Sequence, residues 1–305
     1  MKRALLCSGQ GRIDRNMLDP FVRAPAAASV LEAARTLLGR DPVELLARVD
    51  EDVLLEDRIS QVLCTTRSLS AYLSLDSRAP TMVAGYSIGE MAAWGVAGIW
   101  DPIETLRLAA ARAEFMDQVD GHRGGLGFVR GLDIDVLKDL LAEHGCAIAI
   151  LNPDRMFIIG GERAAVAACC QSAIGRGALS ARPIPVHVAS HTPRLAAAVG
   201  PFLAALARSP SRPPHPDKML IGAAEARPIT SAQDGMSGLA HQLAQTVDWN
   251  AVLVSLVERG AERLLELGPG DALAKMVRAA WPQIEARSID DFRTPEGARS
   301  WFEAA

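Results

Sequence analysis

One stretch of the sequence, AGYSIGEMAAWG at residues 84–95, constrains the fold more than any other. Thr81–Tyr86 has the apolar pattern of a short buried strand, and Ile88–Gly98 has that of a helix. The letters GYSIG between them match G-x-S-x-G, in which a tight turn presents a serine hydroxyl above a sheet. The flanking glycines remove Cβ clashes, and the amide of Ile88 would start a helix and face an oxyanion. The stretch predicts a nucleophilic Ser87, with a chance match as the alternative.

Short apolar runs and helical patterns alternate along the rest of the chain, which is typical of an α/β fold. At 305 residues the chain is long enough for about two domains. Besides the strand and helix around Ser87, the sequence predicts strands at Arg3–Ser8, Met219–Ala223 and Arg263–Leu267. It predicts helices at Ala26–Leu38, Pro42–Val49, Glu51–Leu75, Pro102 to about Val119, Thr192–Arg208, Trp249–Gly260 and Asp271–Ala280.

The pattern changes after a glycine-rich hinge, GHRGGLG, at residues 121–127. The expected elements there follow the order β-α-β-β-α-β: Leu126–Arg130, Asp133–His144, Cys146–Leu151, Met156–Ile159, Glu162–Ile174 and the extended Ala178–Val188. This is the order of a small ferredoxin-like unit. We therefore expect a ferredoxin-like subdomain, residues 123–191, inserted into a larger domain formed by residues 1–122 and 192–305.

Composition argues against several classes of protein. Apolar residues make up 49% of the chain, and 32 basic against 36 acidic residues leave a net charge of −4. That balance has no electrostatic signature for binding nucleic acid or an anionic membrane. No run of about 18 apolar residues exists to span a bilayer, and Ala4–Cys7 is too short for a signal peptide. The five cysteines form no CxxC pair, which favours reduced thiols and a cytoplasmic location.

A serine nucleophile needs a base, and two of the six histidines lie where a strand is expected to end. His191 precedes Thr-Pro at a strand-to-helix junction, and His187 lies four residues earlier. Packing or solvation is the alternative for either. Their spacing also suggests a pair of metal ligands. The helical motif H-E-x-x-H, however, needs a glutamate where Val188 stands. We expect no metal site.

Two glycine-rich loops follow expected strands. The first, Ser8-Gly9-Gln10-Gly11, is not a dinucleotide fingerprint, because Asp14 stands where the third glycine would be. It is not a phosphate-binding P-loop either, because the G-K-[ST] sequence is missing. A loop that leaves a strand can still direct a backbone amide into a site. The second loop, Gly268-Pro269-Gly270, could equally be an ordinary turn between a strand and a helix.

Taken together, these segments resemble the malonyl-CoA:acyl-carrier-protein transacylases and the acyltransferase domains of polyketide synthases. The matches run in order along nearly the whole chain: Ser-Gly-Gln-Gly at 8–11, Gln61, Gly-Tyr-Ser-Ile-Gly-Glu at 85–90, Ala111–Met116, Asn152-Pro153, Ile-Gly-Gly at 159–161, Ala189-Ser190-His191, Trp249 and Glu266–Gly270. The resemblance implies an α/β-hydrolase-like core with an inserted ferredoxin-like subdomain.

The resemblance also implies a role for each matching position. Ser87 would be the nucleophile and His191 the general base, while the amides of Gln10 and Ile88 would form the oxyanion hole. Arg112 would bind the free carboxylate of a malonyl-type group, a task that suits a planar guanidinium. The remaining positions would be Gln61, Tyr86 and Ser190 in the pocket, and a loop near Gln245 whose carbonyl orients the histidine.

The function implied is transfer of a malonyl-type acyl group from coenzyme A to the phosphopantetheine thiol of an acyl carrier protein, through an acyl-serine and with no bound cofactor. Tyr86 replaces the family's usual histidine, and Ala189-Ser190 is a mixed specificity signal, so the acyl unit stays open. An acyl hydrolase on the same scaffold is the main alternative. A non-catalytic module that docks on a carrier protein is a second alternative. A dehydrogenase is disfavoured, because the dinucleotide-binding motif is incomplete.

Overall fold

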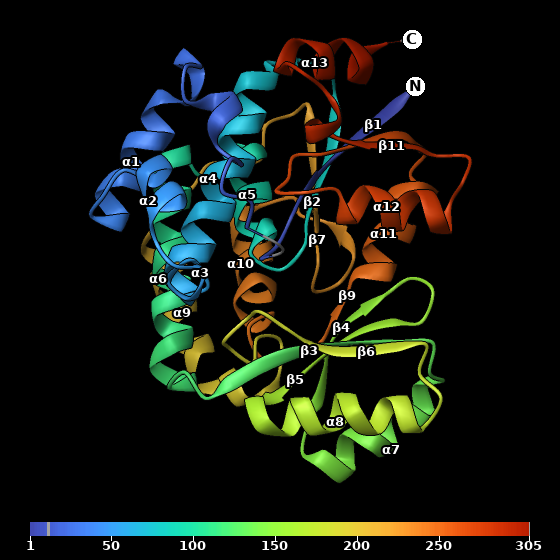
Figure 1. The fold of residues 1–305 in the computed structure, drawn as a ribbon. Helices are drawn as coiled ribbons and strands as arrows, with labels where there is room; N and C mark the ends of the chain where they lie inside the picture. The colour runs from blue at the N-terminus through green and yellow to red at the C-terminus, as the bar shows by residue number, and fades with distance from the viewer. Residues whose placement is uncertain (11–12, 305) are drawn as a thin grey trace.

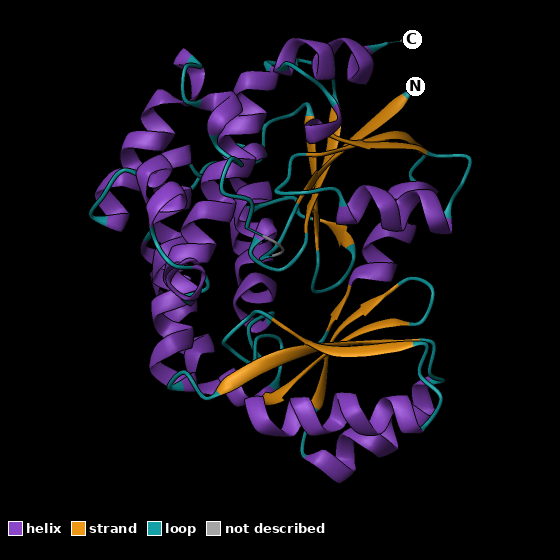
Figure 2. Ribbon diagram, in the orientation of Figure 1, coloured by secondary structure: helices purple, strands orange, loops and turns teal. Residues whose placement is uncertain are grey.

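The computed structural model describes residues 1–10 and 13–304 as a mixed α/β fold built on two β-sheets (Figures 1 and 2). The larger sheet has the strand order β11-β10-β1-β2-β7-β8, and the smaller has the order β6-β3-β5-β4-β9. The larger sheet comprises β1 (Lys2–Cys7), β2 (Thr81–Gly85), β7 (Lys218–Gly222), β8 (Arg227–Pro228), β10 (Ala261–Glu266) and β11 (Glu285–Ser288). The α/β prediction is confirmed at this level.

Every neighbouring pair in the larger sheet is parallel except the pair formed with the two-residue strand β8. Cys7 pairs with Gly85, and Leu6 pairs with Glu266, so β2 and β10 flank β1 in register. Because parallel strands end at the same edge of a sheet, the loops that follow these three strands meet there. Those loops comprise residues 8–10, 86–88 and 267–270.

Helices cover the larger sheet on both faces (Figure 2). The two longest, α4 and α6, pack against each other and carry the predicted residues Gln61 and Arg112. The helices of this part are α1 (Ala28–Leu38), α2 (Pro42–Arg48), α3 (Glu51–Leu54), α4 (Asp57–Leu75), α5 (Gly89–Val96), α6 (Pro102–Asp120), α9 (Ala196–Arg208), α10 (Ala232–His241), α11 (Trp249–Glu258), α12 (Ala272–Ala280) and α13 (Pro295–Glu303). Among the described helices, none is both long and apolar enough to cross a lipid bilayer.

The smaller sheet lies beside the larger one, with α7 and α8 packed on its outer face (Figure 1). It has its own hydrophobic core, which includes Val129, Leu137, Phe157 and Cys169. Four strands come from one continuous segment, and the fifth, β9, comes from much later in the chain and pairs in parallel with β4. These elements are β3 (Gly124–Arg130), α7 (Ile134–His144), β4 (Ala147–Asn152), β5 (Met156–Glu162), α8 (Arg163–Gly175), β6 (Ser180–Ile184) and β9 (Val247–Asp248).

Several elements differ from the sequence-based expectation. The helix predicted at 51–75 is two helices, because Glu56 adopts an extended ψ of 133° between α3 and α4. The helical apolar pattern continues across this break and hides it. The helix α10 was not predicted, since its sequence AQDGMSGLAH is polar and contains two glycines. Tertiary packing of Met236 and Leu239 stabilises it instead, together with the N-cap Ser231, whose hydroxyl oxygen accepts from the Asp234 amide. The strand β11 and helix α13 were also missed.

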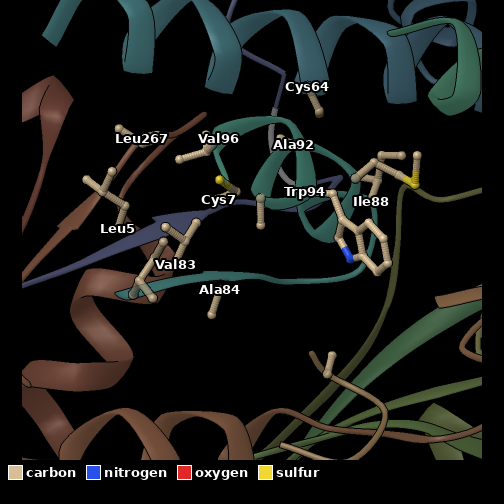
Figure 3. Packing of buried hydrophobic residues seen from close by; sticks show 14 of the residues in the cluster. Leu5, Cys7, Cys64, Val83, Ala84, Ile88, Ala92, Trp94, Val96 and Leu267 are labelled. Atoms are coloured by element: carbon tan, nitrogen blue, oxygen red, sulfur yellow. The ribbon is translucent and has the colours of Figure 1, made fainter. Parts of the chain in front are cut away.

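Buried apolar side chains pack α5 tightly against β1 and β2 (Figure 3). Leu5, Val83 and Ala92 are completely or almost completely buried, and the Trp94 ring stacks on Trp100 at 4.7 Å between ring centroids. A Cβ atom added at Gly89 would overlap the backbone carbonyl of Cys7. Glycine is therefore required where α5 begins, because only a bare backbone lets the helix approach β1 this closely.

We expect Gly89→Ala to lower the free energy of unfolding by about 1–3 kcal/mol, because the added methyl meets backbone that cannot move aside. Gly200→Ala, within α9, is the matched control. It has no atom within 4 Å of the added methyl and should raise stability by up to about 1 kcal/mol. Chemical denaturation of both variants measures the difference, and a neutral Gly89→Ala would contradict the steric argument.

Candidate active site

Ser87 lies in the turn between β2 and α5, at the carboxyl edge of the larger sheet. The turn is closed by hydrogen bonds from the Tyr86 amide to the Cys7 carbonyl, 3.0 Å, and from the Gly89 amide to the Tyr86 carbonyl, 2.9 Å. Ser87 has a φ of +55°, in the left-handed region that non-glycine residues rarely adopt. Such strain persists where the surrounding structure enforces it, and it is concentrated at functional sites.

His191 contacts Ser87 directly, although 104 residues separate them in the sequence. Its Nε2 lies 2.7 Å from the Ser87 hydroxyl oxygen, and its Nδ1 lies 2.7 Å from the backbone carbonyl oxygen of Gln242. A carbonyl oxygen only accepts hydrogen bonds, so Nδ1 carries the proton and Nε2 is left to accept one from the serine. His191 is 1% exposed and also has a positive φ, of 61°.

The carbonyl that faces the histidine belongs to Gln242, which corrects the expectation of Gln245. Gln245 is exposed, whereas Gln242 caps the C-terminus of α10. The last carbonyls of a helix have no partner within the helix, so they are available to a neighbouring donor. The next carbonyl, of Leu243, accepts the backbone amide of His191 at 2.8 Å. The end of α10 therefore holds both the main chain and the ring of His191.

The imidazole of His191 is held in its neutral form. Burial, and to a smaller extent the positive charge of Arg112, lower its pKa to about 3, against the opposing hydrogen bond to Gln242. Burial disfavours any charged form, and a nearby cation disfavours a second one. At neutral pH the ring is therefore unprotonated at Nε2 and able to take a proton from Ser87.

Arg112 is completely buried on α6. Its Nη1 donates to Oε1 of Gln61 at 2.7 Å, while its Nε and Nη2 have no hydrogen-bond partner among the described residues. Burial lowers its pKa to about 10, and the nearby carboxyl groups of Asp57 and Glu90 oppose that shift, so the guanidinium stays charged at neutral pH. A buried cation with two unused donors is suited to a planar carboxylate.

Gln61 does not line the cavity beside Ser87, contrary to expectation: it is completely buried, and its amide bonds to other buried polar groups. It accepts from Arg112 and donates to Asp57 at 2.8 Å. The side chain of Gln10 donates to the same carboxyl group of Asp57 at 2.7 Å. Gly11, which follows Gln10 in the predicted loop, lies outside the described residues.

The amide of Ile88 is at the N-terminus of α5, beside the serine. It has no hydrogen-bond acceptor within the described part of the chain. Helix N-termini carry partial positive charge and unpaired N–H groups. This amide can therefore donate to an oxygen that develops negative charge near Ser87.

A cavity of about 160 Å³ adjoins Ser87 and His191. Tyr86 and Ser190 line it, as expected, and the Tyr86 ring meets Trp249 edge-on at 5.3 Å between centroids. Most of the lining is apolar and comes from the smaller sheet, the segment after β6 and helix α12; it includes Leu126, Ile150, Ile158, Ile184, Val186, Leu273 and Met276. Arg112 itself, completely buried, is not among the lining residues.

Two buried carboxyl groups were given no role by the sequence analysis. Glu266, at the end of β10, accepts from the Ser8 hydroxyl at 2.7 Å and from the Ala274 amide at 2.8 Å. Glu90, on α5, accepts from the amide of Ala223 at 3.1 Å and from the side chain of Gln242. Burial raises the pKa of each to about 7. The signal available in the sequence was an acidic residue within an otherwise apolar element: Glu90 in the first turn of α5 and Glu266 at the end of β10.

The alternative metal pair of His187 and His191 is not supported. Both ring nitrogens of His191 are already engaged, by Ser87 and Gln242. His187 lines a different hollow, beside Arg163. Across residues 1–10 and 13–304, no group of three or more histidine, cysteine, aspartate or glutamate residues could hold a metal ion.

We expect the His191 ring to remain neutral at pH 5, where an imidazole of ordinary pKa, about 6.5, is largely protonated. The lowered pKa places its protonation below that range, so acidification from pH 8 to pH 5 should leave it unchanged. Histidine NMR resonances report this directly, with a His191→Gln variant to assign the signal. A midpoint near 6.5 would contradict the electrostatic account of the site.

Residues 6–291 match the acyl transferase domain family. The malonyl CoA-acyl carrier protein transacylase of Mycobacterium tuberculosis is 26% identical over 292 residues, covering 94% of this chain and 95% of that protein. The polyketide biosynthesis protein ThaF of Burkholderia thailandensis is 29% identical over 304 residues, covering 97% of this chain and 26% of that protein. The crystal structure of an acyl-carrier-protein S-malonyltransferase from Burkholderia pseudomallei is 25% identical, covers 98% of this chain and 100% of that one, and aligns with a TM-score of 0.89. The chain belongs to the acyl transferase domain family.

Proposed function

We propose that this protein transfers a malonyl-type acyl group from coenzyme A to the phosphopantetheine thiol of an acyl carrier protein, through an acyl-Ser87 intermediate. The observation that carries the proposal is the hydrogen-bonded pair of Ser87 and neutral His191, close to a buried Arg112 with two unused donors. The names of the relatives, malonyl CoA-acyl carrier protein transacylases, agree with it.

We also propose an α/β-hydrolase-like core, residues 1–122 and 192–305, with a ferredoxin-like subdomain at 123–191. The parallel sheet with a serine at a strand-to-helix turn supports the first assignment. The strand order β6-β3-β5-β4, with two helices on one face, supports the second. The added strand β9 belongs to the larger part by sequence, so the division is crossed by one pair of strands.

In the first half-reaction, His191 accepts the proton of the Ser87 hydroxyl as the serine oxygen attacks the thioester carbonyl. The carbonyl oxygen becomes an oxyanion, which would accept hydrogen bonds from the amides of Ile88 and Gln10. The carbon–sulfur bond then breaks, and His191 returns the proton to the departing thiol of coenzyme A. The product is an ester between the acyl group and Ser87.

In the second half-reaction the thiol of the carrier protein takes the place of coenzyme A. His191 removes its proton, the sulfur attacks the ester, and Ser87 leaves with the proton from His191. The steps of the first half-reaction thus run in reverse: the ester bond to Ser87 breaks, and a new thioester bond to the carrier protein forms. The mostly apolar cavity that adjoins Ser87, lined by the smaller sheet and α12, would hold the arm of either thiol and exclude the water that would hydrolyse the ester.

Arg112 would both select the acyl group and adjust the base. Its charge lowers the pKa of His191 in the empty site. A malonyl carboxylate bound to its free donors would neutralise much of that charge and make His191 a stronger base. Proton removal from Ser87 would then be easiest when a dicarboxylic acyl group is in place.

We expect Ser87→Ala to abolish acylation of the protein by malonyl-CoA while leaving the fold intact, because no other hydroxyl contacts His191 among the described residues. Intact-mass spectrometry after mixing detects the adduct on the unmodified chain. Ser237→Ala, at an exposed position on α10, should acylate normally. Release of free malonate faster than carrier protein is loaded would instead favour the hydrolase alternative.

We expect Arg112→Ala to lower turnover of malonyl-CoA on the order of 100-fold or more, because charged hydrogen bonds to the carboxylate are lost. Turnover of acetyl-CoA, which has no such carboxylate, should stay the same or rise. Arg107→Ala, on the exposed face of the same helix, is the control and should change neither. Equal losses for both substrates would eliminate the proposed role of Arg112 in selection.

A further inference from the structure

Glu90 is a buried carboxyl group that lies three residues after Ser87, in the first turn of α5. Its Oε1 accepts from the Ala223 amide at 3.1 Å, and its Oε2 accepts from Nε2 of Gln242. It thereby joins the start of α5 to the segments after β7 and after α10. None of the steps described above uses this side chain.

Gln242 connects Glu90 to His191, because its side chain contacts one and its backbone contacts the other. Its backbone carbonyl accepts from Nδ1 of His191, and its side-chain amide donates to Glu90. Gln242 is 2% exposed, and its Oε1 has no partner among the described residues. The bond to Glu90 is thus the anchor that the structure provides for this side chain.

The contacts form a closed ring. Ser87 bonds to His191, His191 bonds to the carbonyl of Gln242, and the side chain of Gln242 bonds to Glu90. The amide of Glu90 then donates to the carbonyl of Ser87 at 3.0 Å. Each member is therefore placed by two others, and a site is held accurately when its supporting groups are themselves locked in this way.

We propose that Glu90 is a positioning residue, which fixes the Gln242 carbonyl, and through it the His191 ring, against Ser87. The proposal rests on the proposed function of Ser87 and His191 as nucleophile and base. Glu90 does not touch the serine hydroxyl or the imidazole, and it acts through the side chain of Gln242. Both carboxyl oxygens of Glu90 accept hydrogen bonds in the structure, so Glu90 also determines which end of the Gln242 amide faces it.

Glu90 also lies near the charge of Arg112, so it could act instead only as a counter-ion. Two variants separate these roles. Gln242→Ala removes the bond and keeps the Glu90 charge and the backbone carbonyl. Glu90→Gln removes the charge but can keep a bond, because rotating the Gln242 amide would let its unpartnered Oε1 accept from the new amide.

The experiment measures the rate at which an uncharged fluorophosphonate labels Ser87, since this reagent needs the serine and its base but not Arg112. Labelling of the unmodified protein tests the proposed nucleophile independently of Glu90. If the unmodified protein is labelled, Glu90→Ala and Gln242→Ala should each slow labelling by about tenfold or more. The double variant should be no slower than either single one, because both changes break the same link.

Steady-state kinetics with malonyl-CoA supply the second measurement. For Glu90→Ala and Gln242→Ala we expect kcat to fall while KM changes less than about twofold, and for Glu90→Gln a smaller loss of kcat. Glu104→Ala is the matched control: it removes a half-buried carboxylate bonded to Arg107 and Ser209, and should lower the melting temperature without slowing labelling.

Three results would overturn the proposal. The first is normal labelling of Gln242→Ala. The second is a double variant whose defect is the product of the two single defects. The third is Glu90→Gln as impaired as Glu90→Ala with a raised KM, which would identify Glu90 as a counter-ion of Arg112 alone.

Discussion

The structure depends above all on how closely α5 approaches β1. The Gly89 backbone is in contact with the Cys7 carbonyl, and this contact leaves no room for a side chain. The chain turns sharply between β2 and α5 at this point, and Ser87 in the turn has a positive φ. The three parallel strands β10, β1 and β2 then bring their following loops to the same edge. Every group that contacts the serine is arranged around this crowded turn.

Charges buried around that turn are paired in a small network instead of being excluded. Arg112 lies near Asp57 and Glu90, and Asp57 in turn accepts from Gln10 and Gln61. Such groups lose hydration on burial, so each needs a partner, and an unpaired one is costly. Two donors of Arg112 nevertheless remain unused within the described residues. These unused donors support the proposed binding of an acyl carboxylate at Arg112.

Much of the candidate site could be anticipated from local sequence. The letters GYSIG located Ser87 in its turn, and the junction before Thr-Pro singled out His191 with one competitor, His187. The break in the helix at Glu56 was not visible, since apolar spacing is unaffected by one extended residue. Gln245 was expected in place of Gln242 because the helix α10, whose end presents the carbonyl, has too polar a sequence to be recognised. Gln61 was placed in the pocket because a sequence does not reveal which polar partners a side chain finds inside the protein.

The sequence by itself determined the α/β pattern, the strand–turn–helix around Ser87 and the residues that resemble the acyl transferase family. These depend on contacts between neighbours in the chain, or on side-chain types at fixed spacing. Only the tertiary structure decided that His191 contacts Ser87, 104 positions earlier in the chain. It also decided that the Gln242 carbonyl accepts from the His191 ring and that the Gln242 side chain donates to Glu90. Such contacts are set by the order of strands in the sheet and by where helices end. Both result from packing the whole chain at once, so no local pattern encodes them.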